Sequence, residues 1–295
     1  QRKFVIMYKG VNKINKIKNL GDGKMKKISN KKILLIAGMM VLSAVAYGKD
    51  VFANYGTSFG KVNLSKVSSI SPEDMKSIDS NTYQLTGNGE YRITDEGKRK
   101  LVVNLSNGTL NGKYDEYYAN GTRFTLGNYN NGKKEGDWMV YTENGNLWKK
   151  YQYKNDQLSG NYTSYYAKTG AQEVVGSYID GKMTGTWTEY YENGARKSQG
   201  NYSNGQKNGL FSEWNTNGGK KSEINYVNDE INGKMNVYYE NGRLLYEANM
   251  SGETGTVKGY YTNGNLGFDG SIRGRRRTGT WTYYDKSGNA RTVNY

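Results

Sequence analysis

Side chains that commonly carry catalysis or bind metals are scarce in this sequence. Its 295 residues include neither Cys nor His, which excludes disulfides and thiolate metal sites and removes the commonest general base. Carboxylates recur at equivalent positions of a repeated pattern, and we interpret them as solvated surface groups: Glu189, Glu192, Glu240 and Asp285. We therefore expect no enzymatic activity, no metal and no cofactor.

Two serine–lysine pairs have the spacing of a nucleophile with a lysine base: Ser29 with Lys32, and Ser58 with Lys61. Both pairs lie outside the repeated pattern, and neither is accompanied by other candidate catalytic residues. We interpret both as coincidental, so the sequence favours binding over catalysis.

Aromatic residues are abundant, with 28 Tyr and 5 Trp. Their large rings, which carry a polar group, are typical of binding surfaces. The repeated pattern places them at regular intervals, and we predict that they form a binding ribbon. Its candidate residues are Trp138, Tyr141, Tyr165, Tyr166, Trp187, Tyr190, Tyr191, Trp214, Tyr238, Tyr239, Tyr260, Tyr261 and Trp281.

These aromatic residues belong to nine units of nearly constant length. Each unit begins with a glycine, and the intervals between these glycines are 22 to 25 residues. The nine glycines are Gly89, Gly112, Gly136, Gly160, Gly185, Gly209, Gly233, Gly255 and Gly279. A fixed period of this kind indicates a repeat architecture over residues 89–295.

One unit has the pattern of a β-hairpin. An apolar residue stands two positions after the first glycine, and an aromatic residue stands five positions after it in every unit but the first. A turn dipeptide such as Asn193-Gly194 and a second strand follow. A lone hairpin is marginally stable, so successive hairpins must pack together. We predict an all-β fold: an elongated array of antiparallel hairpins in a single-layer meander ribbon, preceded by a signal-peptide helix.

Two arrangements of the aromatic residues are compatible with this pattern. Positions two and five of a unit differ by an odd number, so a regular strand would place them on opposite faces of the sheet. A bulge would resolve this, and so would a sheet covered by rings on both sides. The sequence leaves both arrangements open.

The N-terminal part has the organisation of an exported protein. We interpret residues 1–24 as a translated leader and residues 25–46 as a secretory signal peptide, with a lysine-rich start, an apolar run and small residues at Ala44 and Ala46. Cleavage after Ala53 is the alternative. We expect the protein in the periplasm, on the outer surface or outside the cell. An uncleaved signal anchor and a buried core helix are the alternatives for this segment. If the signal-peptide interpretation is wrong, we expect the protein in the cytoplasm.

Residues 47–88 are expected to form a polar linker or cap in front of the repeats. Ser71 and Pro72 have the types expected at a helix start, and two acidic residues follow them. This pattern predicts a short helix near residues 71–79.

The net charge of +15 is concentrated at the N-terminus. Residues 1–46 contain 11 of the 42 Lys and Arg and a single acidic residue, Asp22, so the rest of the chain is nearly balanced and predicts no nucleic-acid partner. One basic cluster stands out in the repeats: Arg273, Arg275, Arg276 and Arg277. It is either an exposed loop without a ligand or a patch for anionic lipid, polysaccharide or an acidic partner.

The segment GTWTEYYENGARKSQGNYSNGQKNG at residues 185–209 resembles the bacterial variant of the MORN repeat, and the resemblance extends over residues 89–295. It implies an elongated hairpin array used for binding. Many bacterial proteins of this kind are labelled as YwqK-type antitoxins, which implies a protein partner, in particular a toxin. The signal peptide departs from a cytosolic antitoxin and is compatible with an exported immunity protein. A surface adhesin or scaffold and a cell-wall carbohydrate- or choline-binding module are the alternatives. The oligomeric state is left open.

Overall fold

The computed structural model describes residues 62–63, 75–77, 82–85, 88–95 and 98–295, all within a compact unit that spans Tyr55–Tyr295. The predicted leader (1–24), the signal peptide (25–46, or to 53) and its helix lie outside the described residues. The described residues form β-strands and the turns between them.

Three short strands form a small antiparallel sheet in the order β1-β3-β2: β1 (Val62–Asn63), β2 (Met75–Ser77) and β3 (Thr82–Leu85). The helix predicted near residues 71–79 is therefore wrong for its described part, Met75–Ser77. This segment pairs with β3, with Met75 opposite Leu85, so cross-strand pairing takes the place of a helical turn. The rest of that prediction lies outside the described residues.

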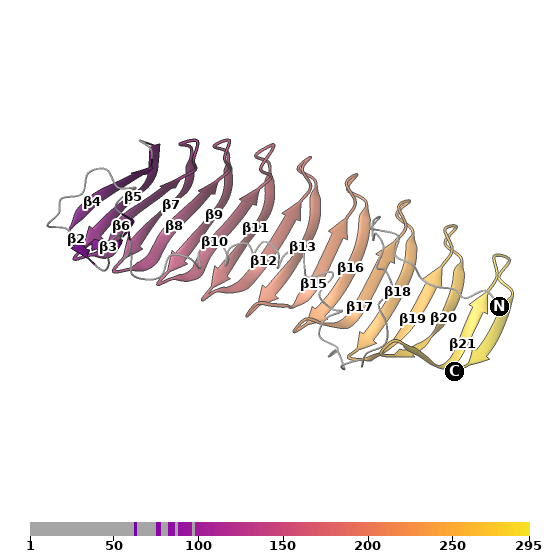
Figure 1. Ribbon diagram of the computed structural model, residues 1–295. Helices are drawn as coiled ribbons and strands as arrows, with labels where there is room; N and C mark the ends of the chain where they lie inside the picture. Colours follow the sequence, from indigo (N-terminus) through magenta and orange to yellow (C-terminus); the bar gives the residue numbers. More distant parts are fainter. Residues whose placement is uncertain (1–61, 64–74, 78–81, 86–87, 96–97) are drawn as a thin grey trace, which may run out of the picture. The chain divides into compact units, whose positions relative to one another are not determined.

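Nineteen further strands, β4 to β22, form one open antiparallel sheet in which strands follow one another in chain order (Figure 1). The predicted all-β meander of hairpins is confirmed. The strands are β4 (Gly89–Asp95), β5 (Lys98–Ser106), β6 (Thr109–Tyr117), β7 (Arg123–Asn130), β8 (Lys133–Tyr141), β9 (Leu147–Lys154), β10 (Gln157–Tyr165), β11 (Gln172–Ile179), β12 (Lys182–Tyr190), β13 (Arg196–Ser203), β14 (Gln206–Lys207), β15 (Gly209–Trp214), β16 (Lys220–Val227), β17 (Glu230–Tyr238), β18 (Leu244–Ser251), β19 (Thr254–Tyr260), β20 (Leu266–Arg273), β21 (Arg276–Tyr284) and β22 (Ala290–Asn294). β14 and β15 both pair with β13 and act as one interrupted strand.

The first glycine of a unit opens a bulge. In β12, Gly185 has a φ of 65°, in the left-handed region that glycine adopts without strain. Between the paired residues Thr184 and Thr188, three residues of β12 lie opposite Gly176 alone. The unit that begins at Gly255 lacks this bulge, because β18 and β19 pair without a register shift. The missing bulge explains why the interval before Gly255 is 22 residues instead of the usual 24.

After the bulge, the first strand of a unit alternates regularly. Trp187, Thr188, Glu189 and Tyr190 pair in sequence with β13, and the irregularity that follows Glu189 lies on the partner strand. Trp187 and Tyr190 therefore lie on opposite faces of the sheet. Of the two arrangements that the sequence left open, the structure has the one with rings on both faces. We call the face of position two the core face and the face of position five the outer face.

Two kinds of turn join the strands. In most turns between units both central residues have positive φ, as at Asn131 (47°) and Gly132 (79°), which matches the tight two-residue hairpin turn. The turns at Gly252 and Gly274 have a positive φ at the first central residue alone. Within a unit, Gly121 has a φ of 88°, while the side chain of Asn120 accepts a hydrogen bond from Thr122 N (2.9 Å). The Asn120 amide also donates to the Glu143 carbonyl of the next unit (3.0 Å). Asn120 therefore stabilises this turn through its side chain, and the positive φ is at Gly121.

The core face carries a continuous series of ring contacts, with centroids 5.1 to 6.4 Å apart. We call these rings the core row: Tyr114, Tyr129, Trp138, Tyr151, Tyr153, Tyr162, Tyr178, Trp187, Tyr202, Phe211 and Tyr226. A second cluster follows around Ala248, Val257 and Trp281. Several core rings lie flat on a glycine of the preceding strand; a Cβ on Gly176 would overlap the Trp187 ring. Within the described sheet, β4 to β22, the stacked rings pack against one another on this face.

Candidate functional site

The structure divides the thirteen aromatic residues of the predicted binding ribbon into three sets with different surroundings. Three belong to the core face, four connect neighbouring units, and six form a row on the outer face. The sequence predicted one binding surface, but these residues lie on both faces of the sheet and at the contacts between units.

The first set consists of Trp138, Trp187 and Trp281, whose exposed fractions are 0%, 6% and 4%. Trp138 packs between Tyr114, at 5.6 Å, and Tyr129, at 5.3 Å. These side chains hold the array together, and their burial leaves little ring surface for a partner.

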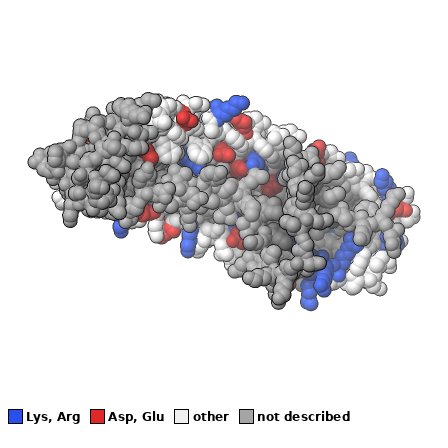
Figure 2. Space-filling model, viewed as in Figure 1, with Lys and Arg blue, Asp and Glu red and all other residues white. Residues whose placement is uncertain are grey.

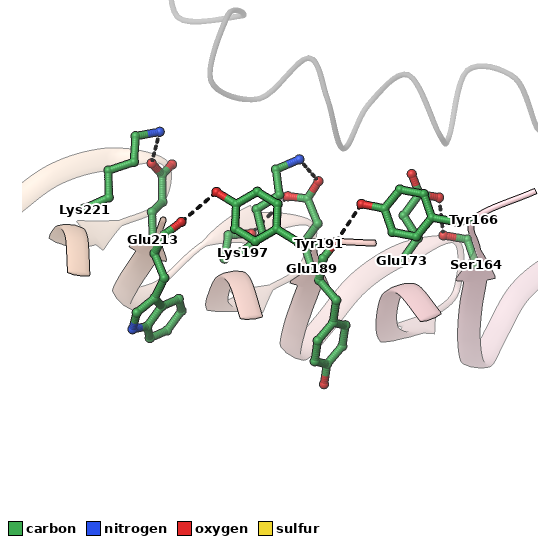
Figure 3. A network of polar contacts seen from close by, with 11 residues as sticks. Ser164, Tyr166, Glu173, Glu189, Tyr191, Lys197, Glu213 and Lys221 are labelled. Atoms are coloured by element: carbon green, nitrogen blue, oxygen red, sulfur yellow. Dashed lines mark hydrogen bonds and ion pairs between the residues drawn. The ribbon is translucent and has the colours of Figure 1, made fainter. Parts of the chain in front are cut away.

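The second set connects each unit to the next. The hydroxyls of Tyr166 and Tyr191 donate to the carbonyls of Tyr190 and Trp214, each at 2.8 Å (Figure 3). Tyr239 and Tyr261 make the same bond to the following unit, both at 2.7 Å. Tyr118, which the sequence did not single out, does so at 2.9 Å. The second tyrosine of the repeated pair is therefore an inter-unit staple.

The third set is the first residue of the same pair. With Tyr117 and Tyr284, which the predicted binding ribbon left out, it forms the outer row: Tyr117, Tyr141, Tyr165, Tyr190, Trp214, Tyr238, Tyr260 and Tyr284. All eight side chains are half-buried. Both residues stand at the five-residue offset from the unit glycine that the sequence analysis describes, so this offset alone identifies all eight members.

The outer-row rings lean along the sheet. Tyr117 donates to Asp115 (2.8 Å), two residues earlier on its own strand. Tyr238 and Tyr260 instead reach carboxylates of the preceding strand, Glu223 (2.7 Å) and Glu247 (2.6 Å). A hydroxyl that bonds to the sheet surface holds the ring over that surface, where its face is available for stacking.

Residues of the second strands alternate with these rings. Each pairs directly with the outer-row residue of its own unit: Arg123, Leu147, Gln172, Arg196, Lys220, Leu244 and Leu266. Arg196 lies over the Trp214 ring at 5.2 Å and Arg123 over the Tyr141 ring at 5.9 Å. We call these seven paired residues the spacers. Rings and spacers alternate along the outer row.

Charges on the outer face are compensated locally. Asp115 is fully buried between Lys113 (3.0 Å) and Arg123 (2.7 Å). Burial alone would raise the pKa of Asp115, but hydrogen bonds from Arg123, Tyr117 and Lys113 outweigh it and the pKa lies below its usual range.

Three further ion pairs lie on this face. They are Lys150 with Asp137 (3.2 Å), Lys220 with Glu223, and Lys258 with Glu247 (3.6 Å). Beside the first pair, a polar hollow of 160 Å³ is lined by Lys150, Gln152, Asn161 and Thr163.

The core face carries ion pairs of its own (Figure 3). Glu189 binds Lys197 (2.6 Å) and accepts from Ser198 (3.1 Å), and Glu213 binds Lys221 (3.1 Å). The four carboxylates singled out in the sequence have no common location, since Glu192, Glu240 and Asp285 lie in the turns within units and Glu189 lies in a strand. No group of three acidic side chains suited to a metal ion occurs among the residues that the structure describes.

The arginine cluster is divided as well. Arg273, Arg275 and Arg276 are exposed at the turn between β20 and β21, and Figure 2 shows a group of basic side chains at the edge near the C-terminal strands. Arg277 instead donates to the hydroxyls of Tyr283 (2.7 Å) and Tyr295 (2.8 Å) and lies over the Trp281 ring at 4.9 Å. Arg277 is exposed as well, but its guanidinium is engaged with the aromatic cluster at the end of the sheet.

The described part of the chain contains no helix with the length and apolar character needed to cross a membrane. The search of curated proteins found no match to this sequence. Among solved structures, the chain is similar to one described as "Crystal Structure of TcdB2-TccC3-Cdc42", with 13% identity and a TM-score of 0.15 over 72% of this chain. The chain spans 16% of the length of that relative, and a likeness at this TM-score supports no statement about function.

The sequence also matches a family model described as MORN repeat variant. The match covers four segments, residues 134–155, 183–204, 207–228 and 231–251. Each segment covers the hairpin of one unit, with its two strands and the turn between them. These four segments of the chain are therefore similar to MORN repeats.

Proposed function

We propose that this protein is an exported, non-catalytic binding protein that holds another macromolecule along its outer row. One observation carries the proposal. Once the core row and the inter-unit staples are assigned, the outer row is the recurrent aromatic set that is left, and its eight rings are half-buried on a face with locally compensated charge. Half-exposed tyrosine and tryptophan side chains are the residue types enriched in interfaces.

A protein is the partner class that the repeat resemblance supports, and a toxin is the specific partner that the antitoxin label suggests. The lysine-rich, apolar segment at residues 25–46 supports an encounter outside the cytosol. A toxin partner would form a stoichiometric complex with the chain. Anionic lipid or polysaccharide at Arg273, Arg275 and Arg276 is the second candidate, favoured by the exposure of these three side chains.

Capture of the partner by the purified chain tests this function. The double variant Tyr165→Ser/Tyr190→Ser removes two adjacent outer-row rings, and Leu210→Ser is the matched control, because Leu210 is 49% exposed on the same face but outside the row. We expect the double variant to lose at least about tenfold in affinity for the captured partner, and the control to keep it. Equal capture by all three proteins would refute binding through the outer row.

A further inference from the structure

The outer row has a regular spacing that restricts its ligand. Its rings lie on the first strands of successive units, so two strand spacings separate one ring from the next. At about 4.8 Å per strand, the rings repeat about every 10 Å. A ligand that meets several rings in the same way must itself repeat at close to this distance.

A polyproline II helix has such a repeat. It contains three residues per turn with a rise of about 3.1 Å each, so one turn advances about 9 Å. Successive turns therefore present the same side of the helix at nearly the spacing of the rings. We propose that the outer row binds a proline-rich segment of a partner protein in the polyproline II conformation. This inference rests on the proposed function and specifies the chemistry of its partner.

The spacers between the rings support this ligand. A polyproline II segment makes no internal hydrogen bonds, and its carbonyls need donors while its prolines have no N–H to offer. Arg123, Gln172, Arg196 and Lys220 each bring donors to the row. A guanidinium carries five N–H donors, and the bonds of Arg123 to Asp115 use two of its N–H groups.

Charge complementarity points in the same direction. Three of the acidic groups beside the row are already engaged: Asp115 by Arg123 and Lys113, Glu223 by Lys220 and Tyr238, Glu247 by Lys258 and Tyr260. What remains toward solvent is ring surface and N–H donors. This combination is complementary to proline rings and the partial negative charge of carbonyls, and recognition of such segments by aromatic-lined grooves is an established binding mode.

A neutral polysaccharide fits the pattern less well. Sugar hydroxyls donate as well as accept, so a glycan site needs free acceptors beside its rings. Asp115, Glu223 and Glu247 already accept hydrogen bonds. Among the spacers, the arginines and the lysine only donate, the leucines do neither, and Gln172 alone brings an acceptor. The chemistry of the row therefore favours the peptide.

The central part of the row is the strongest candidate segment. From Tyr141 to Trp214 it contains four rings with Leu147, Gln172 and Arg196 between them. Four rings correspond to about 12 residues of polyproline II helix. A peptide of this length meets all four rings, and one of half the length meets two.

Titration of the full chain with oligoproline peptides tests the inference. We expect a peptide of about 12 residues to bind with a change in tryptophan fluorescence, because Trp214 is the tryptophan of the row. Trp138, Trp187 and Trp281 are buried, and the partly buried Trp148 lies outside the row. The Trp214→Phe variant should keep most of the binding and lose most of the signal. A peptide of about six residues should bind at least about tenfold more weakly, and a Gly-Ser peptide of equal length should not bind.

Variants of one ring locate the site. Tyr190→Ser should weaken oligoproline binding about tenfold, Tyr190→Phe should restore it because the ring remains, and Leu210→Ser should bind as the unaltered chain does. Binding that does not depend on peptide length, or that survives Tyr190→Ser unchanged, would overturn the inference.

The outcomes also separate this inference from the proposed function. If oligoproline does not bind but the Tyr165→Ser/Tyr190→Ser protein still loses its captured partner, the polyproline ligand is wrong and the binding role of the row stands. If a neutral β-1,4-linked oligosaccharide binds and the Tyr190→Ser variant loses that binding, the polyproline ligand is again wrong and the binding role of the row again stands. If the row variants change the binding of no ligand at all, both proposals are wrong.

Discussion

At the scale of single residues, each recurrent position of the unit has one physical task. The first glycine provides a positive φ for the bulge, the residue at position two supplies a core ring, and a glycine of the preceding strand makes room for that ring. Trp187 over Gly176 is the clearest case, because the ring occupies the space where a Cβ would stand. The interior is closely packed, so even one added methyl group must displace a neighbour.

Substitution Gly176→Ala tests this contact. The new Cβ must push the Trp187 ring out of place, and we expect a loss of about 1–3 kcal/mol in the free energy of unfolding, measured by urea denaturation. Gly267→Ala is the control, because a Cβ there would meet its neighbours at ordinary contact distance, the nearest atom being 3.4 Å away. Equal losses in both variants would contradict the packing argument.

At the scale of the hairpin, the repeated tyrosine pair divides its work between two surfaces. Tyr190 contributes its ring to the outer row, and Tyr191 donates to the Trp214 carbonyl of the next unit. The bond joins units that are consecutive in the chain, so each unit stabilises its neighbour. Such nearest-neighbour coupling is how repeat arrays become cooperative.

Removing one staple hydroxyl should loosen one junction. We expect Tyr191→Phe to lower the free energy of unfolding by about 0.5–1.5 kcal/mol, since it keeps the ring and leaves the Trp214 carbonyl without this donor. Tyr190→Phe is the paired control, because the Tyr190 hydroxyl has no hydrogen-bond partner among the described residues, and it should change stability by less than about 0.5 kcal/mol. If both variants are equally stable, the staple does not contribute.

At the scale of the whole sheet, many tyrosines share a raised pKa. Burial raises the pKa of Tyr153, Tyr162 and Tyr202 to about 12 each. An exposed tyrosine of the unfolded chain ionises near pH 10. Between these values the unfolded chain releases protons that the folded sheet retains, so the folded state loses stability as pH rises.

The sheet should therefore be sensitive to alkali. We expect the free energy of unfolding to be constant with respect to these groups below about pH 10 and to fall steeply between about pH 10 and 12. Circular dichroism, recorded together with tyrosinate absorbance, measures both events in one titration. Ionisation of all tyrosines near pH 10 with the sheet intact would mean that the core row is not closed to water.

The sequence by itself determined the architecture, because repetition at a fixed period, aromatic residues at fixed offsets and turn dipeptides constrain the backbone locally. The sequence also identified the recurrent aromatic residues, but it did not distinguish those that pack in the core from those that are available for binding. It predicted a helix near residues 71–79 from local capping signals, and pairing with a neighbouring strand overrode those signals in Met75–Ser77.

The tertiary structure decided which aromatic residues share a face and what each contacts. Tyr190 and Tyr191 are adjacent and chemically identical, yet one belongs to the outer row and the other bonds to the next unit. That distinction depends on the bulge at Gly185, which sets the face of the sheet to which each following side chain points. It also depends on the Trp214 carbonyl, which belongs to a unit more than twenty residues away and accepts the Tyr191 hydrogen bond. Register and inter-unit distance are properties of the folded sheet, so no local pattern in the sequence could supply them.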